Sequence, residues 1–379
     1  MRVLEISRPP RPAWAALAAA ALLTACAIPG PVAEPQGLGP TEARALVSQL
    51  LPERVRDKPG WAADLHAALS TLALPSTPTN LCAVMAVTEQ ESGWQADPPV
   101  PGLAGIARKE IDRRAAQAGV PDLAVRAALA LQSPDGRSYA ERLDKVKTER
   151  ELSELFEDFI GMVPLGRTFF ADRNPVRTGG PMQVSIAFAE AQVQQRRYPY
   201  AIQDSVRREV FTRRGGLYFG AAHLLDYAAP YDQPIFRFAD FNAGRWASRN
   251  AAFQNAVAVA SGLPLALDGD LLPPAGTQAV GETERAVYGL ASRIGLSEAA
   301  MRRDLARGDG PGFETTELYR RVFDYASKLD RRTLPQAVLP RIDLQSPKFT
   351  RPLTTEWFAR RVDERYRRCL SRIEALKGG

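Results

Sequence analysis

The chain carries the stretch Thr-Glu-Gln-Glu-Ser-Gly-Trp at residues 88–94. This stretch ends an apolar segment, residues 80–92, whose hydrophobic side chains recur at helical spacing. At about 100° per residue, Glu91 falls on the same side of that helix as Leu81 and Val84. A carboxyl group at the end of an apolar stripe is partly desolvated, and desolvation raises the pKa of an acid. The stretch therefore predicts Glu91 as a proton donor, with an ion-paired glutamate at a helix end as the alternative.

Two later turns carry side-chain amides. Residues 180–185 read Gly-Pro-Met-Gln-Val-Ser, and residues 241–244 read Phe-Asn-Ala-Gly. Glycine permits tight turns, and the amides of Gln183 and Asn242 can both donate and accept hydrogen bonds. We expect these two amides to share one polar groove with the carboxyl group of Glu91.

Helical periodicity extends through nearly the whole chain. Apolar residues recur at intervals of three and four, as in Leu152, Leu155, Phe156 and Phe159. Alternating runs with paired turn signals are nearly absent, so the sequence predicts an all-α fold. The turn-rich residues 268–277 form the clearest internal boundary. They separate a helical domain, residues 41–267, from a C-terminal helical extension, residues 278–379.

The N-terminus has the features of an export signal. Residues 1–25 contain three arginines, a short apolar run and then Leu-Thr-Ala directly before Cys26. This arrangement fits a bacterial lipoprotein signal, which makes Cys26 the lipidated first residue of the mature chain. Residues 26–40 are rich in proline and glycine and predict an extended tether. The alternative is an ordinary signal peptide cut near Ala25.

The other cysteines agree with export. With Cys26 lipidated, Cys82 and Cys369 remain as an even pair, and the compartment outside the inner membrane is oxidising. Cys82 lies on the helix that carries Glu91, and Cys369 lies on the last helix of the chain. We predict that a disulfide joins them, with two unrelated buried thiols as the alternative.

Composition is that of an ordinary globular chain with a mild positive balance. The net charge is +6 and the isoelectric point is about 9.3, which suits anionic wall polymers and membrane surfaces. The positive charge is too diffuse to indicate nucleic-acid binding. The only histidines are His66 and His223, so the sequence predicts no metal site and no cofactor. His223 lies in an apolar helix, which favours a core histidine.

Together, the three motifs resemble those of the soluble lytic transglycosylases of the lysozyme-like superfamily. In that family a Glu-Ser pair carries the catalytic acid/base, which matches Glu91 and Ser92. The resemblance covers mainly residues 80–96 and 176–260. Ser92 and the remaining matches are expected to contact substrate: Gly180, Met182 and Gln183 in a Gly-Leu-Met-Gln turn, Tyr218 in a Gly-x-x-Tyr helix, and Phe241 and Asn242 in a Tyr-Asn-Ala-Gly segment.

The resemblance implies a lysozyme-like helical core that cleaves peptidoglycan glycan strands. Glu91 would protonate the oxygen leaving the MurNAc–GlcNAc bond and then take the proton of the 6-hydroxyl, which closes a 1,6-anhydro ring. The implied partners are glycan strands and the membrane that holds the lipid on Cys26. Ala27 follows that cysteine, and by resemblance to lipoprotein sorting in enteric bacteria this implies the outer membrane, facing the periplasm.

Two features depart from the family pattern. Phe241 replaces a tyrosine, so a hydroxyl near the catalytic carboxyl is missing. Glu91 and Gln183 are 92 residues apart, so residues 97–175 are expected to form an inserted helical lobe. Two other functions therefore stay open: a lipoprotein that binds peptidoglycan without cutting it, and a helical lipoprotein that scaffolds the cell envelope.

Overall fold

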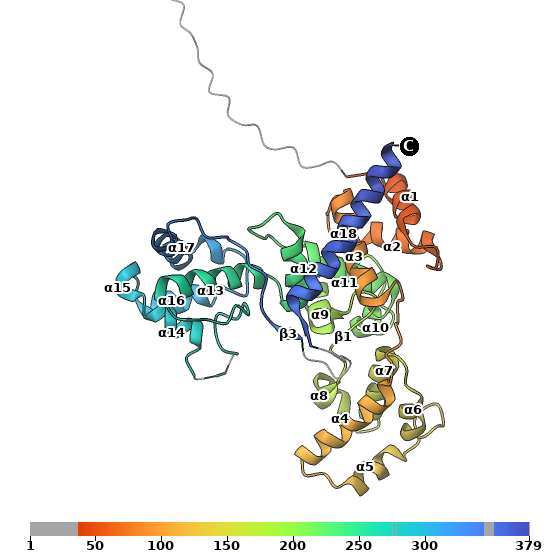
Figure 1. Cartoon of the computed structure of the whole chain (residues 1–379). Helices are drawn as coiled ribbons and strands as arrows, with labels where there is room; N and C mark the ends of the chain where they lie inside the picture. Colours follow the sequence, from red (N-terminus) through yellow and green to blue (C-terminus); the bar gives the residue numbers. More distant parts are fainter. Residues whose placement is uncertain (1–36, 275, 278, 345–351, 379) are drawn as a thin grey trace, which may run out of the picture. The chain divides into compact units, whose positions relative to one another are not determined.

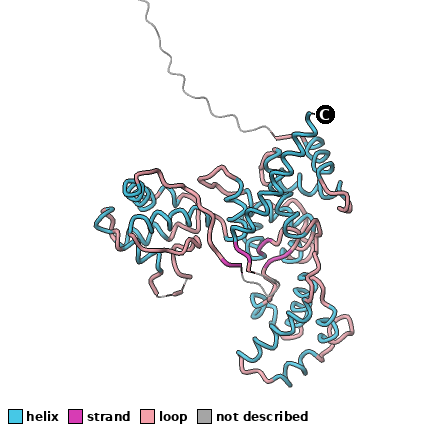
Figure 2. Tube along the Cα trace, in the orientation of Figure 1, coloured by secondary structure: helices cyan, strands magenta, loops and turns pink. Residues whose placement is uncertain are grey.

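The computed structural model describes residues 37–274, 276–277, 279–344 and 352–378. Gly37–Gly379 form one compact unit by their internal contacts. Secondary structure in the described residues is mostly helical, with two short pairs of antiparallel strands and no closed sheet (Figure 2). The all-α prediction is confirmed. The predicted lipidation site, Cys26, lies outside the described residues.

The elements follow one another along the chain in the order seen in Figure 1. The longer helices are α1 (Pro40–Leu50), α2 (Lys58–Thr71), α3 (Pro78–Ser92), α4 (Leu103–Gln117), α5 (Asp122–Leu129), α6 (Tyr139–Lys145), α7 (Glu149–Gly161), α9 (Ile186–Gln195), α11 (Arg213–Leu225), α12 (Pro234–Ala243), α13 (Ala247–Ser261), α14 (Glu282–Tyr288), α16 (Glu298–Leu305), α17 (Glu317–Asp330) and α18 (Thr355–Gly378). The shorter elements are α8 (Gly166–Phe170), η1 (Ala171–Arg173), α10 (Val206–Val210), α15 (Ala291–Ile294), η2 (Phe313–Thr315) and strands β1 (Thr178–Gly179), β2 (Val184–Ser185), β3 (Asp343–Leu344) and β4 (Leu353–Thr354).

Helix α3 lies in the middle of the first hydrophobic core. Thr77 caps its N-terminus by accepting a hydrogen bond from the Asn80 amide at 3.1 Å, and Pro78 provides a fixed first turn. Residues 81–88 are all buried, because α3 packs against both α11 and α18. The sequence led us to expect a single apolar side, whereas this helix is enclosed on all sides, as expected for a helix inside a core.

A second hydrophobic core gathers α13 with α14, α16 and α17. It includes Phe253, Val287, Phe313 and Val322, all fully buried. Because α13 ends at residue 261, this core spans the boundary predicted at residues 268–277. Helix α13, which the sequence places in the domain of residues 41–267, thus shares a core with helices of the predicted C-terminal extension.

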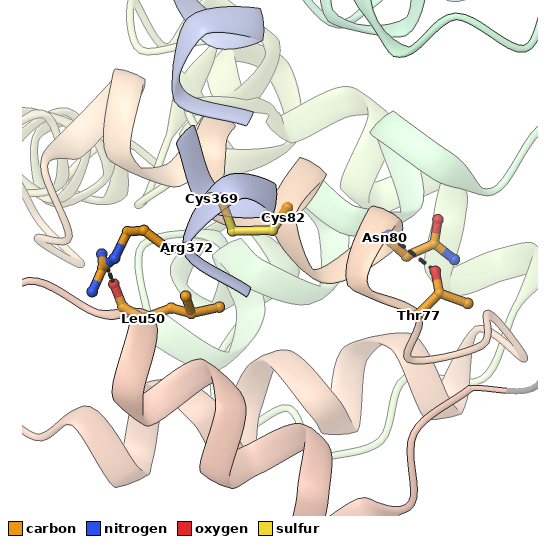
Figure 3. Close-up of a disulfide and its surroundings, with 6 residues drawn as sticks. All are labelled: Leu50, Thr77, Asn80, Cys82, Cys369 and Arg372. Atoms are coloured by element: carbon orange, nitrogen blue, oxygen red, sulfur yellow. Dashed lines mark hydrogen bonds between the residues drawn. A yellow bond between two sulfur atoms is a disulfide. The ribbon is translucent and has the colours of Figure 1, made fainter. Parts of the chain in front are cut away.

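Helix α18 returns from the C-terminal part of the chain to the first core. It packs along α3 and α12, and the disulfide Cys82–Cys369 joins it to α3 with an S–S distance of 2.01 Å (Figure 3). The Arg372 guanidinium also donates a hydrogen bond to the Leu50 carbonyl oxygen at 2.7 Å. The predicted disulfide is confirmed, and α18 belongs with the helices around α3.

The predicted inserted lobe corresponds to helices α4–α8 and the loops between them. Apolar side chains of α4, α5, α6 and α7, including Leu103, Leu143 and Leu152, extend the first hydrophobic core. None of the helices in the described part of the chain is both long and apolar enough to cross a bilayer.

Candidate active site

The three predicted motifs meet at one open cavity of about 670 Å³. Glu91, Gln183 and Asn242 all line it, although they come from α3, the turn between β1 and β2, and the end of α12. Three segments far apart in sequence thus supply one carboxyl group and two amides to a single space. The remaining lining residues are Pro98, Pro99, Val100, Pro101, Glu149, Thr178, Val184, Ser185, His223, Phe241, Ala243 and Gly244.

Glu91 lies in the last turn of α3. The helix stops immediately afterwards because Gly93 adopts a left-handed conformation, with φ of 57°, which glycine tolerates without strain. Ser92 turns inward instead, and its hydroxyl donates to the Thr88 carbonyl oxygen at 3.0 Å. This helix end therefore presents a half-buried Glu91 to the cavity while Ser92 stays in the interior.

The turn that carries Gln183 is held by close backbone packing. Gly180 has φ of 73°, and a Cβ atom there would lie 2.0 Å from the Val210 carbonyl oxygen, so only glycine fits. Gln183 itself has φ of 51°, an uncommon conformation for a residue with a side chain. The Thr178 hydroxyl donates to the Gln183 side-chain oxygen at 3.4 Å. The turn thus fixes the position of the amide at the cavity wall.

A buried carboxylate anchors the turn that carries Asn242. Asp240 is completely buried and accepts hydrogen bonds from the Tyr227 and Tyr231 hydroxyls and from the Trp246 and Ser248 amides. Burial raises the pKa of Asp240, while the hydrogen bonds act in the opposite direction. This network ties the corner between α12 and α13 to its surroundings, which fixes the backbone of residues 241–244.

Asn242 is also tied to the last helix. The Thr355 hydroxyl, at the start of α18, donates to the Asn242 side-chain oxygen at 3.1 Å. Thr355 is completely buried whereas Asn242 is exposed, so the contact joins the interior to the cavity surface. The sequence motifs gave no indication of it, because the two residues are 113 positions apart.

His223 is the main feature of the cavity that the sequence reasoning missed. It lines the cavity, and its ring packs edge-on against Phe241, with ring centres 5.1 Å apart. Burial lowers the pKa of His223 to about 4, and the nearby Arg245 guanidinium adds to this shift. The ring is therefore neutral at neutral pH. Its Nδ1 atom is buried and has no hydrogen-bond partner in the described part of the chain.

Four residues expected to contact substrate do not line the cavity. Met182 is completely buried and packs so closely on α11 that a Cβ atom at Gly220 would lie 2.3 Å from its sulfur. Tyr218 is also buried, and its hydroxyl donates to the Arg197 carbonyl oxygen at 2.8 Å. With Gly180 and Ser92, these residues support the cavity wall from behind.

A second carboxyl group lines the same cavity. Glu149 is the first residue of α7, and the sequence reasoning gave it no role. Glu149 belongs to the inserted lobe, and folding brings the start of α7 to the cavity that Glu91 lines. Across residues 37–274, 276–277, 279–344 and 352–378, we find no grouping of side chains suited to hold a metal ion. The side chains that line the cavity supply carboxyl, amide and imidazole groups.

Comparison with known proteins supplies the family. A family model described as "Protein of unknown function (DUF1615)" matches residues 54–372. The chain belongs to this family. It is 51% identical over 354 residues to the protein described as "Uncharacterized protein YaiW" of Escherichia coli strain K12, covering 93% of this chain and 96% of that protein. No solved structure matches the chain.

The family assignment covers every part of the cavity. Residues 54–372 contain Glu91, Glu149, Gln183, His223 and Asn242, together with both cysteines of the disulfide. The cavity therefore lies within the segment that defines the DUF1615 family.

Proposed function

We propose that this DUF1615 protein is a lytic transglycosylase-like enzyme that cleaves the glycan strands of peptidoglycan. One observation carries the proposal: Glu91, Gln183 and Asn242 come together at one cavity. The order of the three motifs along the chain resembles that of the soluble lytic transglycosylases, whose site contains one acid and several hydrogen-bonding amides. We further propose that the helices around α3 form a lysozyme-like core, with α4–α8 as the insertion.

In the proposed mechanism Glu91 performs both proton transfers. Its carboxyl group first protonates the oxygen that leaves the MurNAc–GlcNAc bond, while positive charge develops on the MurNAc ring. The resulting carboxylate then accepts the proton of the 6-hydroxyl of the same sugar. That hydroxyl oxygen attacks the anomeric carbon, and a 1,6-anhydro ring forms. No water is consumed, and Glu91 regains its proton.

The two amides that line the cavity supply the hydrogen bonds that a sugar requires. Gln183 and Asn242 each offer a donor and an acceptor, which suit hydroxyl and N-acetyl groups. Phe241 lacks the hydroxyl that a tyrosine would place there. His223 lies against Phe241 and provides a neutral polar wall at this position, because its pKa is about 4.

A second candidate is glycan hydrolysis with two carboxyl groups. Glu149 lines the same cavity as Glu91, and most glycoside hydrolases use a pair of carboxyl groups for catalysis. In that reaction Glu91 would protonate the leaving oxygen and Glu149 would activate a water molecule. The product would carry a reducing end instead of an anhydro ring, so the two candidates differ in product mass by one water.

We also propose that the enzyme works while anchored to a membrane. The signal and Cys26 predict a lipid at the start of the mature chain, and residues 27–36 would connect that lipid to the compact unit Gly37–Gly379. Such a tether would keep the cavity near the wall polymer. We place the protein at the outer membrane, facing the periplasm.

Digestion of purified sacculi tests the function. A soluble form of the protein that lacks residues 1–26 should release 1,6-anhydro products, separated and identified by mass. Glu91→Gln should reduce their release by at least about 100-fold, because an amide can neither donate nor recover the required proton. Its thermal unfolding should match that of the wild-type protein, since the shape of the side chain is kept.

The product mass and the variants separate the alternatives. Glu149→Gln should leave anhydro products intact under the transglycosylase mechanism and abolish all products under hydrolysis. Wild-type protein that binds sacculi without releasing any product would favour a non-catalytic peptidoglycan-binding lipoprotein. Equal activity of the wild-type protein and Glu91→Gln would eliminate the assignment of Glu91.

A further inference from the structure

A second cavity, of about 830 Å³, adjoins the candidate active site. It is formed by α4, α7 and the segment of residues 173–178. Glu149 and Thr178 line both cavities, so the two spaces meet at these side chains. A ligand that extends from the sugar-sized space would therefore enter the second cavity directly.

The floor of this second cavity is apolar and firmly held. Leu103, Leu152 and Val176 are almost completely buried beneath it. The segment that carries Val176 is fixed by Asn174, which is buried, donates to the Ser153 hydroxyl at 3.1 Å and accepts from the Val176 amide at 3.0 Å. The cavity is thus a pre-formed apolar surface, which suits methyl and methylene groups of a ligand.

The rim of the cavity carries an excess of positive charge. Five basic side chains line it, against the two carboxyl groups of Glu110 and Glu149: Lys109, Arg113, Arg114, Arg173 and Arg177. Glu110 binds two of the arginines, Arg113 at 2.7 Å and Arg114 at 2.6 Å. These contacts lower the pKa of Glu110 to about 2, so it is ionised at neutral pH.

Three of the five cations are available to a ligand. Lys109, Arg173 and Arg177 are exposed, and none of them forms an ion pair with a residue that the structure describes. Arg173 instead lies over the ring of Phe170, at 5.9 Å. The chemistry that fits this surface is a short chain with several carboxylates and small apolar groups, joined to whatever occupies the first cavity.

We infer that the second cavity binds the acidic peptide stem of the same glycan whose sugars occupy the first. This inference rests on the proposed function, because it takes the polymer to be peptidoglycan. The stem branches from MurNAc and combines carboxylates with alanine methyl groups, which matches the cationic rim and the apolar floor. Binding the stem would also place the MurNAc ring beside Glu91, so the cavity would select strands that still carry peptides over strands that have lost them.

Calorimetric titration with three small probes tests the inference. The probes are GlcNAc–MurNAc-tetrapeptide, GlcNAc–MurNAc and the free tetrapeptide. None contains a MurNAc–GlcNAc bond, so the enzyme does not consume them. The protein is the soluble chain of residues 27–379, which keeps the whole compact unit. The peptide-bearing probe should bind roughly tenfold more tightly than the bare disaccharide, as two partly exposed charge contacts would give.

Two variants show where this preference arises. Arg173→Ala combined with Arg177→Ala should reduce the preference to within about twofold, and 0.5 M salt should weaken it in the wild-type protein. Arg126→Ala removes an exposed arginine of α5 that does not line the cavity, so it should keep the full preference. Thermal unfolding should be unchanged in all of these proteins, because the side chains are exposed.

The outcomes separate this inference from the proposed function. Equal affinity for the two disaccharides, with anhydro products still released from sacculi, would overturn the inference and leave the enzyme assignment in place. Binding of the free tetrapeptide that the double variant abolishes, without disaccharide binding or sacculus digestion, would keep the cavity as an acidic-peptide site and remove the proposed function. Binding of phosphatidylglycerol vesicles through the same two arginines, with no peptide preference, would identify a membrane-facing surface and overturn the inference.

Discussion

Buried polar groups in the two hydrophobic cores differ in how completely they are hydrogen-bonded. In the second core Arg249 is completely buried, and its guanidinium donates to Glu314, Asn250 and the Gly308 and Gly310 carbonyl oxygens. Beside the cavity in the first core, the buried Nδ1 of His223 has no partner within the described residues. The buried charge of the second core is fully hydrogen-bonded. A buried ring nitrogen without a hydrogen-bond partner, in contrast, lies beside the open cavity.

The difference indicates different roles for the two regions: buried groups of the second core stabilise the fold, and groups at the cavity are available to a ligand. A buried charge is tolerated only when it is fully paired, so Arg249 and its partners hold helix α13 to residues 308–314. Half-buried groups such as Glu91 and Gln183 instead line a cavity and keep contact with solvent. Substitutions in the second core should therefore change stability, and substitutions at the cavity should change activity.

The largest effect should come from removing the buried guanidinium. Arg249→Met should lower the free energy of unfolding by about 4 kcal/mol, because Glu314 and the Gly310 carbonyl oxygen lose this donor and the Gly308 carbonyl oxygen keeps only the Asn250 amide. Chemical denaturation followed by circular dichroism measures this loss. At temperatures where the variant is folded, its activity on sacculi should equal that of the wild-type protein.

Arg303→Met is the matched control for that substitution. Arg303 is 73% exposed and lies 3.5 Å from Asp304, so its loss should cost less than about 0.5 kcal/mol. Similar losses at the two positions would contradict the view that the second core depends on its buried ion pair.

The disulfide should have the next largest effect, confined to the first core. Cys82→Ala combined with Cys369→Ala should lower stability by about 3 kcal/mol, the typical contribution of a native disulfide, because the bond between α3 and α18 is lost. Amide hydrogen exchange should show faster opening of α3 and α18, with α17 unchanged. Wild-type protein treated with a reductant should behave like the variant. Equal acceleration in α3 and α17 would show that the two cores open together.

Several of these features could be predicted from the sequence because they depend on local patterns. Helical spacing predicted α3 within two residues of its observed start, and the even cysteine pair predicted the disulfide. From the motifs we predicted that Glu91, Gln183 and Asn242 share one groove, and the structure places all three at one cavity. Their catalytic and binding roles remain predictions.

Other features depend on burial between distant segments, which a local pattern does not contain. Met182 and Tyr218 belong to conspicuous motifs, yet they are buried behind the cavity wall. His223 was interpreted as a core residue because its helix is apolar, and its ring nevertheless reaches the cavity. The signal in the sequence was its position five residues after Tyr218, on the same Gly-x-x-Tyr helix.

Burial of His223 predicts a dependence of stability on pH. The pKa of His223 is about 4 in the folded protein and near its ordinary value of 6.5 in the unfolded chain, so the unfolded chain binds the proton more tightly. Stability should therefore fall as the pH decreases from about 6.5 towards 4. Between pH 7 and pH 4.5 we expect a loss of roughly 2 kcal/mol from this group.

His223→Gln isolates that contribution, since glutamine stays neutral throughout the range. The difference in stability between variant and wild type should shift in favour of the variant as the pH falls. His66, whose pKa is also lowered by burial, is present in both proteins and cancels. A pH-independent difference between the two proteins would show that protonation of His223 carries no such cost.

The smallest effect should come from Glu89, two residues before the proposed catalytic acid on the same helix. Glu89 does not line the candidate active site; it lines a separate small cavity together with Trp94, Arg365 and Cys369. Its carboxylate lies 4.0 Å from the exposed Arg54 guanidinium, so Glu89→Gln should change stability by less than about 0.5 kcal/mol. Release of anhydro products should stay within twofold of the wild-type rate. A loss of activity as large as that of Glu91→Gln would mean that helix α3 as a whole, and not the carboxyl group facing the cavity, governs the reaction.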